Sequence, residues 1–366
     1  MKTRTELLKI IEGGLEKNRD KVQSYAQLLM EKLRAEGEEK FADRIKDILD
    51  KKNVHPVYLD EFLSKPVDQD SRLDMVDISI SDAPKDEIIL PELTKTKVDN
   101  YVSSLKHRGE FVKLGIDLPE SLLLYGPPGC GKTSIAHYIS QQTSLPLITA
   151  KLDALVSSLL GSTAKNIRRI FEYAKERPCI LFLDEFDAIA KSRNDEHEVG
   201  ELKRVVNSLL QNIDSFNQNN ILIAATNHEK LLDPAVWRRF STVIEIPKPT
   251  DTEITKLLQL FLKNVECNFI NDSKKFSKVA SLLQGLSPSD IKVLSYNAIK
   301  AAVIAEEKIV TYPSFVYQIY LFKGFNEEQI TLISYLNENG VTQAEISKTL
   351  GISLRQVRKV LNNEEG

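Results

Sequence analysis

The sequence predicts an α/β fold: a P-loop-type parallel sheet with helices on both faces, then an α-helical lid, with small all-α regions at both ends. Two observations predict it. Between about residues 87 and 250, strand-like apolar runs alternate with helical patterns, which is typical of a parallel sheet covered by helices. From about residue 250 to 320 the pattern is helical throughout. The strand-like runs read SLLLYG, LPLITA, CILFLDE, ILIAATN and TVIEIP.

Composition bounds the class of protein. The chain has 366 residues, of which 42% are hydrophobic and 28% are charged. This length and balance predict a globular protein of two or three domains. The formal net charge of −3 gives no general reason for nucleic-acid binding. Any such binding has to come from a local basic surface.

The cysteines and the apolar runs predict the compartment. Cys130, Cys179 and Cys267 are widely and irregularly spaced, which favours neither a disulfide scaffold nor a zinc site. A reducing cytoplasm is therefore expected. The first 20 residues contain no apolar run of signal-peptide length, and no segment reaches the length of a membrane span. We expect no membrane partner.

The two ends of the chain differ from the middle in the spacing of their apolar residues. Apolar residues at helical spacing, interrupted by Gly13-Gly14 and Gly37, predict two or three short amphipathic helices at the N-terminus. We interpret them as a docking domain. A proline-containing stretch follows, read as a linker with room for one short strand. The predicted parts are 1–50 (docking), 51–86 (linker), 87–248 (α/β), 249–322 (lid) and 323–366 (C-terminal helices).

A glycine-rich segment after the first strand has the pattern G-x-x-x-x-G-K-[ST]. It follows SLLLY and opens the helical run SIAHYIS, which is the context expected of a phosphate-binding loop. Backbone N–H groups of such a loop can surround phosphate oxygens, Lys132 can reach the β- and γ-phosphates, and the Thr133 hydroxyl can ligate Mg²⁺. The predicted ATP-binding residues are Gly126, Pro127, Pro128, Gly129, Cys130, Gly131, Lys132, Thr133 and Ser134.

Cys130 has two interpretations. Its place at a helix N-terminus lowers the pKa of a thiol, which suits a redox switch. The alternative is a small residue at a variable loop position, and we favour it.

Two further strands end in polar residues that suit hydrolysis. CILFLDE ends in Asp184 and Glu185, beside the phosphate loop at the carboxyl edge of the sheet. Asp184 is expected in the Mg²⁺ shell, and Glu185 is expected to polarise the attacking water. ILIAATN ends in Asn227, an amide that can orient the same water from the other side.

LLDPAVWRRF predicts a short helix that ends in paired arginines. Asp233 is a suitable N-cap and Pro234 suits the first helical position. Arg238 and Arg239 near the helix end fit two interpretations. They cap the helix in solvent, or they serve as arginine fingers for the γ-phosphate of a neighbouring subunit.

With these motifs in order, the chain resembles an AAA-family ATPase across roughly residues 85–300. The resemblance implies a homo-oligomeric ring, generally a hexamer, with ATP and Mg²⁺ bound between subunits. It implies finger roles for Arg238 and Arg239, although the compact RRF differs from the commoner form with Pro-Gly between the arginines. IDSF implies inter-subunit roles for Asp214 and Phe216, with serine where glycine is usual. QGLSPSDI resembles the lid motif that lies against adenine.

The resemblance also implies a pore loop. Leu159, Leu160 and Gly161 occupy the position where the family usually has an aromatic, a hydrophobic residue and glycine. Leucine offers less contact area than an aromatic ring, so we expect a weaker grip on a polypeptide. The alternative is that Leu159 is a buried helix residue. A second pore loop is expected near 194–200, where a plain charged loop is an equal alternative.

The last 40 residues resemble a bacterial helix-turn-helix. A Thr342-x-x-Glu345 capping box and Gly351 delimit the second helix, and the third helix carries Arg355, Arg358 and Lys359 as candidate DNA contacts. The residues 326–366 contain four basic and six acidic side chains. Because phosphate contacts supply most DNA affinity, one copy would bind weakly. A packing role is the alternative, and we favour it.

Two functions therefore remain. The first is ATP hydrolysis in an oligomeric ring, coupled to remodelling or regulation of a partner protein. The resemblance to certain bacterial ATPases implies that one such partner is a subtilisin-like protease. The second is a DNA-associated ATPase that binds through the C-terminal helices.

Overall fold

The computed structural model describes residues 4–15, 19–35, 37–51, 65–67, 74–80, 88–115, 120–152, 160–190, 201–216, 220–324 and 329–364. The chain forms two compact units, Met1–Lys65 and Pro66–Gly366. Across the described ranges, no helix has the length and apolar character needed to cross a membrane.

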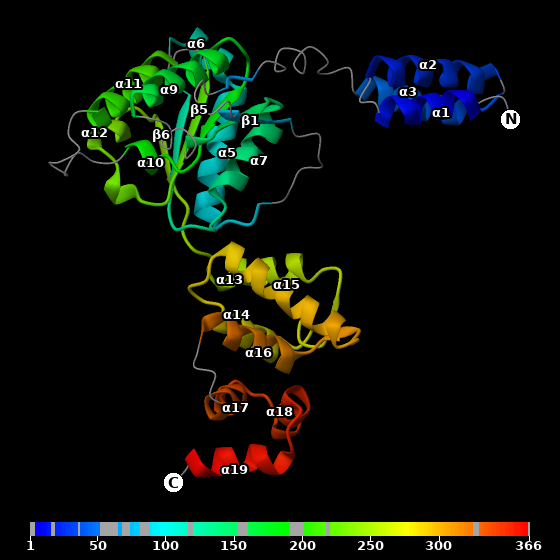
Figure 1. Cartoon of the computed structure of the whole chain (residues 1–366), viewed down its shortest axis with the longest axis vertical. Coiled ribbons are helices and arrows are strands. Elements are labelled where there is room, and N and C mark those ends of the chain that lie inside the picture. The colour runs from blue at the N-terminus through cyan, green and yellow to red at the C-terminus, as the bar shows by residue number, and fades with distance from the viewer. Residues whose placement is uncertain are drawn as a thin grey trace. The chain divides into compact units, whose positions relative to one another are not determined.

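The N-terminal unit is a set of three helices (Figure 1): α1 (Arg4–Leu15), α2 (Arg19–Ala35) and α3 (Glu39–Lys51). Its buried apolar cluster is small and consists of Leu29, Leu33 and Ala42, with Ile10, Met30 and Ile45 packed against it. Other apolar side chains of these helices lie in solvent, among them Leu7, Leu8, Ile11, Leu28 and Phe41.

The second unit is built on a six-stranded sheet with the order β1-β3-β4-β5-β2-β6. The strands are β1 (Val76–Ser79), β2 (Ser121–Tyr125), β3 (Leu147–Ala150), β4 (Ile180–Leu183), β5 (Ile221–Thr226) and β6 (Thr242–Glu245). Strands β2 to β6 are parallel, which confirms the predicted sheet. The edge strand β1, from the stretch expected to be a linker, is antiparallel to β3.

Helices cover both faces of the sheet (Figure 1). Leu122 and Leu124 of the central strand pack in one cluster with Val98, Ile135 and Ile139 of α5 and α7. Helices α9 and α11 lie on the other face, joined by an edge-to-face contact of Phe171 and Phe216. The helices of this layer system are α5 (Glu92–Lys106), α6 (Arg108–Lys113), α7 (Lys132–Thr143), α9 (Leu160–Lys175), α10 (Asp187–Ala190), α11 (Glu201–Phe216), η1 (Glu229–Leu231) and α12 (Pro234–Trp237).

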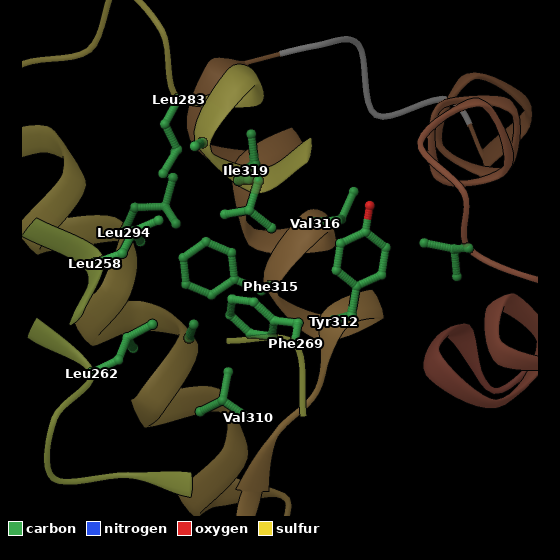
Figure 2. Close-up of a cluster of buried hydrophobic side chains, with 14 of the residues drawn as sticks. Leu258, Leu262, Phe269, Leu283, Leu294, Val310, Tyr312, Phe315, Val316 and Ile319 are labelled. Atoms are coloured by element: carbon green, nitrogen blue, oxygen red, sulfur yellow. The ribbon is translucent and has the colours of Figure 1, made fainter. Parts of the chain in front are cut away.

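A helical lid follows, and its first helices begin at side-chain caps. The lid elements are α13 (Asp251–Phe261), β7 (Glu266–Cys267), α14 (Ser273–Leu282), α15 (Pro288–Ile304), β8 (Ile309–Val310) and α16 (Tyr312–Lys323). Thr250 with Glu253, and Ser287 with Asp290, form capping boxes. Phe269, Tyr312 and Phe315 pack together in the lid core (Figure 2).

The C-terminal helices belong to the same core as the lid. They are α17 (Gln329–Glu338), α18 (Gln343–Leu350) and α19 (Leu354–Glu364). Their buried apolar side chains Ile333, Leu336, Val341, Ile346 and Val357 form one cluster with the lid residues. The Tyr312 hydroxyl of α16 donates a hydrogen bond to the Asn339 carbonyl at 2.5 Å. These helices are therefore an extension of the lid.

Candidate functional site

The turn between β2 and α7 forms a tight cradle that needs glycine at two positions. Gly126 has φ of +143°, and a Cβ on it would stand 2.2 Å from the Ile246 carbonyl oxygen. Gly129 has φ of +72°, and a Cβ there would stand 2.6 Å from the Ser287 hydroxyl. Because an L side chain is strained at these angles and also has no room, both positions require glycine. The backbone of the loop is thereby free to approach a ligand.

Lys132 lies at the start of α7 with its ammonium turned into this cradle. Its Nζ donates to the carbonyl oxygens of Gly126 at 2.8 Å and Pro127 at 2.9 Å. The residue is buried, and this burial lowers the pKa of the ammonium, although nearby acidic groups oppose the shift. A buried cation next to open backbone N–H groups favours a phosphate oxygen as its partner.

Thr133 and Asp184 meet as the predicted metal ligands should. The Thr133 hydroxyl donates to Asp184 Oδ2 at 2.7 Å, across 51 positions of sequence. Asp184 follows β4 directly, so its carboxylate lies at the carboxyl edge of the sheet beside the cradle. A hydroxyl and a carboxylate at contact distance are oxygen donors of the kind that Mg²⁺ prefers. Both residues thus fit a Mg²⁺ ion that accompanies a nucleotide phosphate.

Glu185 sits in a strained backbone conformation. Its φ is +49°, in the left-handed region that a glutamate rarely adopts. The conformation is held from both sides: Glu185 N–H donates to Asp184 Oδ1 at 3.0 Å, and Phe186 N–H donates to the Ala225 carbonyl at 2.8 Å. Strain of this kind persists where the surroundings over-determine it, which is common at catalytic positions. The turn keeps the Glu185 side chain exposed at the cleft.

A buried hydrogen-bond network holds the end of β5, where Asn227 follows. Thr226 Oγ1 donates to Asp187 Oδ1 at 2.8 Å, and the His228 N–H donates to Thr226 Oγ1 at 3.0 Å. Asn227 lies between these anchored neighbours and lines the same cleft as Asp184 and Glu185. The structure therefore brings these three predicted residues together.

The cleft has a volume of about 800 Å³, enough for a nucleotide. Its predicted part is the glycine-rich loop with the acidic residues. The lid segment QGLSPSDI contributes Pro288 and Ser289 to the lining, but sequence patterns missed the remaining walls, which come from the segment before α5, from α7 and from other lid residues. These additional lining residues include Ile88, Ile89, His137, Leu257, Phe261 and Lys292. Apolar walls suit a flat heteroaromatic base. Their one sequence signal is the apolar pair Ile88-Ile89 before a helix start.

The lid touches the phosphate cradle directly. The Ser289 N–H, in the first turn of α15, donates to the Gly129 carbonyl at 3.1 Å. Lys248 Nζ donates to the Gly285 carbonyl at 2.6 Å. These contacts hold the QGLSPSDI segment over the loop, at the position expected from its resemblance to a lid motif.

The environment of Cys130 argues against the redox-switch interpretation. The residue is buried, and burial raises the pKa of its thiol despite the neighbouring cations Lys132 and Lys248. Because the thiolate is the reactive form, a raised pKa favours an inert thiol.

The paired arginines are placed differently from each other. Asp233 caps α12 by accepting from the Ala235 N–H at 2.8 Å. Arg238 is exposed, whereas Arg239 forms an ion pair with Asp214 at 3.0 Å. Among the described residues, the cleft lining includes neither arginine. Phe216 is buried against Phe171, so it supports the end of α11 within the subunit.

The pore-loop prediction falls mostly outside the described residues. Leu159 and the second loop at 194–200 lie outside them, and Leu160 and Gly161 are the first residues of α9. At the C-terminus, Arg355, Arg358 and Lys359 are all exposed on α19. Gly351, with φ of +66°, makes the turn after α18.

A glycine-rich loop between a parallel strand and a helix, a buried lysine and a Thr-Asp pair define a P-loop nucleotide-binding protein. The comparison with known families narrows this class. The profile of the ATPase family associated with various cellular activities (AAA) matches residues 122–248. The chain belongs to the AAA family, and it is an ATPase that binds ATP with Mg²⁺.

The similar proteins include an AAA family ATPase and several proteasome-activating nucleotidases. The AAA family ATPase y4kL of Sinorhizobium fredii is 41% identical over 226 residues, which cover 62% of this chain and 67% of that protein. Proteasome-activating nucleotidase 1 of Haloferax volcanii is 37% identical over 195 residues, 51% of this chain and 47% of the relative. The Pyrococcus furiosus proteasome-activating nucleotidase is 36% identical over 233 residues, which cover 62% of this chain and 58% of that protein. This chain spans about half the length of these archaeal relatives.

Proposed function

We propose that the chain acts as a homo-oligomeric ring, a hexamer, in which ATP lies between subunits. The placement of the catalytic groups carries the proposal. Asp184, Glu185 and Asn227 meet in one cleft, whereas the exposed Arg238 lies outside the described lining of that cleft. An exposed arginine on a rigid helix turn suits a γ-phosphate held by a neighbouring subunit. Cytoplasmic conditions suit the three free cysteines.

Two measurements test the ring: the mass of the particle in solution and the ATP turnover of mixed variant subunits. Glu185→Gln keeps the site shape and removes the catalytic carboxylate, so it should bind ATP, form the ring by light scattering and lose turnover. Arg238→Ala mixed with Lys132→Ala should recover part of the turnover, because each subunit supplies the group that the other lacks. A monomer at all nucleotide concentrations, with no recovery on mixing, would contradict the proposal.

We propose that the ring acts on another protein. The nucleotidase relatives are named for activating proteasomes, and the resemblance implies a subtilisin-like protease as a partner. The exposed apolar side chains Leu7, Leu8, Ile11 and Phe41 of the N-terminal unit suit docking of such a partner. The test is ATP turnover with an unstructured polypeptide or with an active-site-inactivated subtilisin-like protease. Stimulation by either should disappear in Leu8→Glu, with basal turnover unchanged; no stimulation by either contradicts the idea.

We propose that Leu159 grips this client weakly. Tyrosine offers a larger flat contact than leucine, and alanine offers less. Leu159→Tyr should therefore raise, and Leu159→Ala lower, the client-stimulated turnover. Indifference to both substitutions would remove Leu159 from the gripping residues.

A second candidate function, DNA binding, is supported by the charge on α19. Arg355, Arg358 and Lys359 are exposed on this helix, which begins after a three-residue turn that follows α18. The lid adds exposed cations that a count of the C-terminal residues alone leaves out: Lys274 and Lys278 on α14. Against the opposing effect of burial, hydrogen bonds with Thr342 and, to a smaller extent, the charge of Lys275 on α14 lower the pKa of Glu345 in the first turn of α18. Several copies in a ring would raise the affinity for a polyanion.

Fluorescence anisotropy with duplex DNA tests this candidate. Arg358→Glu should weaken binding and flatten its salt dependence, and Lys278→Glu should do the same to a smaller extent. Lys256→Glu on α13, exposed and outside this surface, is the charge-matched control. No salt-dependent binding by the assembled protein would remove the candidate.

A further inference from the structure

Arg239 is bound by its own subunit through two groups. Its Nε lies 3.0 Å from Asp214 Oδ1, at the end of α11, and its Nη1 donates to the Ala235 carbonyl of α12 at 2.6 Å. Only 27% of the side chain is exposed. The contact of Nε with Asp214 is an ion pair without hydrogen-bond geometry, so the directional contact is the Nη1 hydrogen bond; together the two hold the planar guanidinium against its own subunit. The side chain is therefore directed into its own subunit.

The backbone of Arg239 is anchored as well. Its carbonyl accepts from the Ser121 hydroxyl, at the start of the central strand β2, at 3.0 Å. The next residue, Phe240, packs edge to face on Phe186, with ring centroids 6.0 Å apart. Phe186 directly follows the strained Glu185. Arg239 thus stands where α11, α12, β2 and the catalytic turn meet.

Arg238 differs from its neighbour in the placement of its side chain. It is exposed, and within the described part of the chain its guanidinium makes no hydrogen bond or ion pair. The preceding residue, Trp237, packs edge to face on Tyr125, with ring centroids 5.5 Å apart. Tyr125 is the last residue of β2, directly before the phosphate cradle. The backbone on both sides of Arg238 is held, while its side chain is available to another molecule.

We propose that the two arginines have separate tasks: Arg238 is the single trans-acting finger, and Arg239 is a positioning residue that works within its own subunit. The Arg239–Asp214 ion pair fixes the turn after α12 and so aims Arg238 at the neighbouring site. This division rests on the proposed ring, because only a ring brings Arg238 to a second nucleotide. A fixed turn loses less freedom when the finger engages, which favours the reaction.

A double-mutant cycle on ATP turnover tests the division. Arg238→Ala should lower kcat by about 10³- to 10⁵-fold, the usual value of an arginine finger. Arg239→Ala and Asp214→Ala should each lower kcat by about 10- to 100-fold, the effect of misplacing a catalytic group. The KM for ATP should stay unchanged, and the double variant should be no slower than either single variant.

Controls separate positioning from damage to the fold. Trp237 is the one tryptophan of the chain and adjoins the finger, so its fluorescence reports the local turn. Asp214→Asn keeps the shape of the side chain and should reproduce the loss seen in Asp214→Ala. Asp77→Ala breaks a different surface ion pair of the same length, Lys151–Asp77 at 3.0 Å, and should leave turnover unchanged.

The division is overturned if Arg239→Ala is as slow as Arg238→Ala while Asp214→Ala matches the wild type, because Arg239 is then itself a finger. Losses at 239 and 214 that multiply in the double variant also overturn it. If the ring proposal itself is wrong, the result is different, because Arg238→Ala then hydrolyses ATP at the wild-type rate. In that case thermal unfolding, followed through Trp237 fluorescence, still tests the contact between Arg239 and Asp214 within one subunit. Melting-temperature shifts of the two single variants that simply add in the double variant would overturn this contact.

Discussion

The two ends of the chain are both sets of three short helices, yet they hold together in different ways. The N-terminal helices form their own compact unit around a core of Leu29, Leu33 and Ala42. The C-terminal helices bury Ile333, Leu336, Val341, Ile346 and Val357 in a core shared with the lid. A small separate core is marginally stable, whereas a shared core makes each helix set depend on the other.

The comparison bears on what each end can do. A unit with its own core can be removed or exchanged without exposing the ATPase, which suits a docking module. Helices that complete the lid core move with the lid, and the lid contacts the phosphate cradle through Ser289 and Gly129. We therefore expect the C-terminal surface to respond to the nucleotide.

Deleting each end should give the largest contrast. Removal of residues 1–65 should leave the thermal transition of the ATPase and its basal turnover in place, since no core residue of the second unit is lost. Removal of residues 325–366 takes away five buried apolar side chains, each worth about 1.5–3 kcal/mol. This deletion should unfold or aggregate the lid, measured by thermal melting and size exclusion. Equal tolerance of both deletions would break the comparison.

A matched pair of leucine substitutions sharpens the contrast at single residues. Leu336 of α17 is fully buried and Leu8 of α1 is 66% exposed. Leu336→Ala should cost about 2–5 kcal/mol of unfolding free energy through lost contacts and a cavity. Leu8→Ala should change it by less than about 0.5 kcal/mol. Denaturant titration of each variant gives both values, and a small effect at Leu336 would mean that the shared core is loose.

The hydrogen bond from Tyr312 to Asn339 predicts a pH dependence of the lid. Burial raises the pKa of Tyr312 to about 12, so the hydroxyl stays a donor at neutral pH. Because the unfolded value is about 10, the stabilisation is complete below pH 10 and is lost as pH rises towards 12. Tyr312→Phe should cost about 1–3 kcal/mol at pH 7 by leaving the Asn339 carbonyl unsatisfied. The melting temperature of the variant should lie below that of the wild type at pH 8, and the difference should shrink at pH 11.

The smallest effect is expected in the N-terminal unit. The Arg34–Asp43 ion pair joins α2 to α3 at 3.0 Å, with 45% and 64% of the two side chains exposed. Water screens such a pair, so Arg34→Ala should cost no more than about 0.5 kcal/mol. Chemical denaturation of the unit at low and high salt measures it. A cost above that of Leu336→Ala would reverse the comparison.

Local patterns in the sequence predicted the strands well, and they placed the candidate catalytic residues at strand ends. Five apolar runs became the five parallel strands, and Asp184, Glu185 and Asn227 follow strand ends, so one sheet edge collects them. The lid residues of the cleft, such as Phe261 and Lys292, carry no comparable signal. They reach the cleft because α13 and α15 pack over the phosphate loop, and helical spacing alone does not specify which helices will meet.

What the sequence by itself determined is the chemistry of the site, because a glycine-rich loop, a lysine and two carboxylates at strand ends are local features with local causes. Only the tertiary structure decided which of these residues contact each other within the chain. It joined the C-terminal helices to the lid through Tyr312 and Asn339, and it paired Arg239 with Asp214 while leaving Arg238 exposed. In the sequence the two arginines are equivalent neighbours. Packing separates them, because a carboxylate 25 positions earlier in the chain lies within reach of only one.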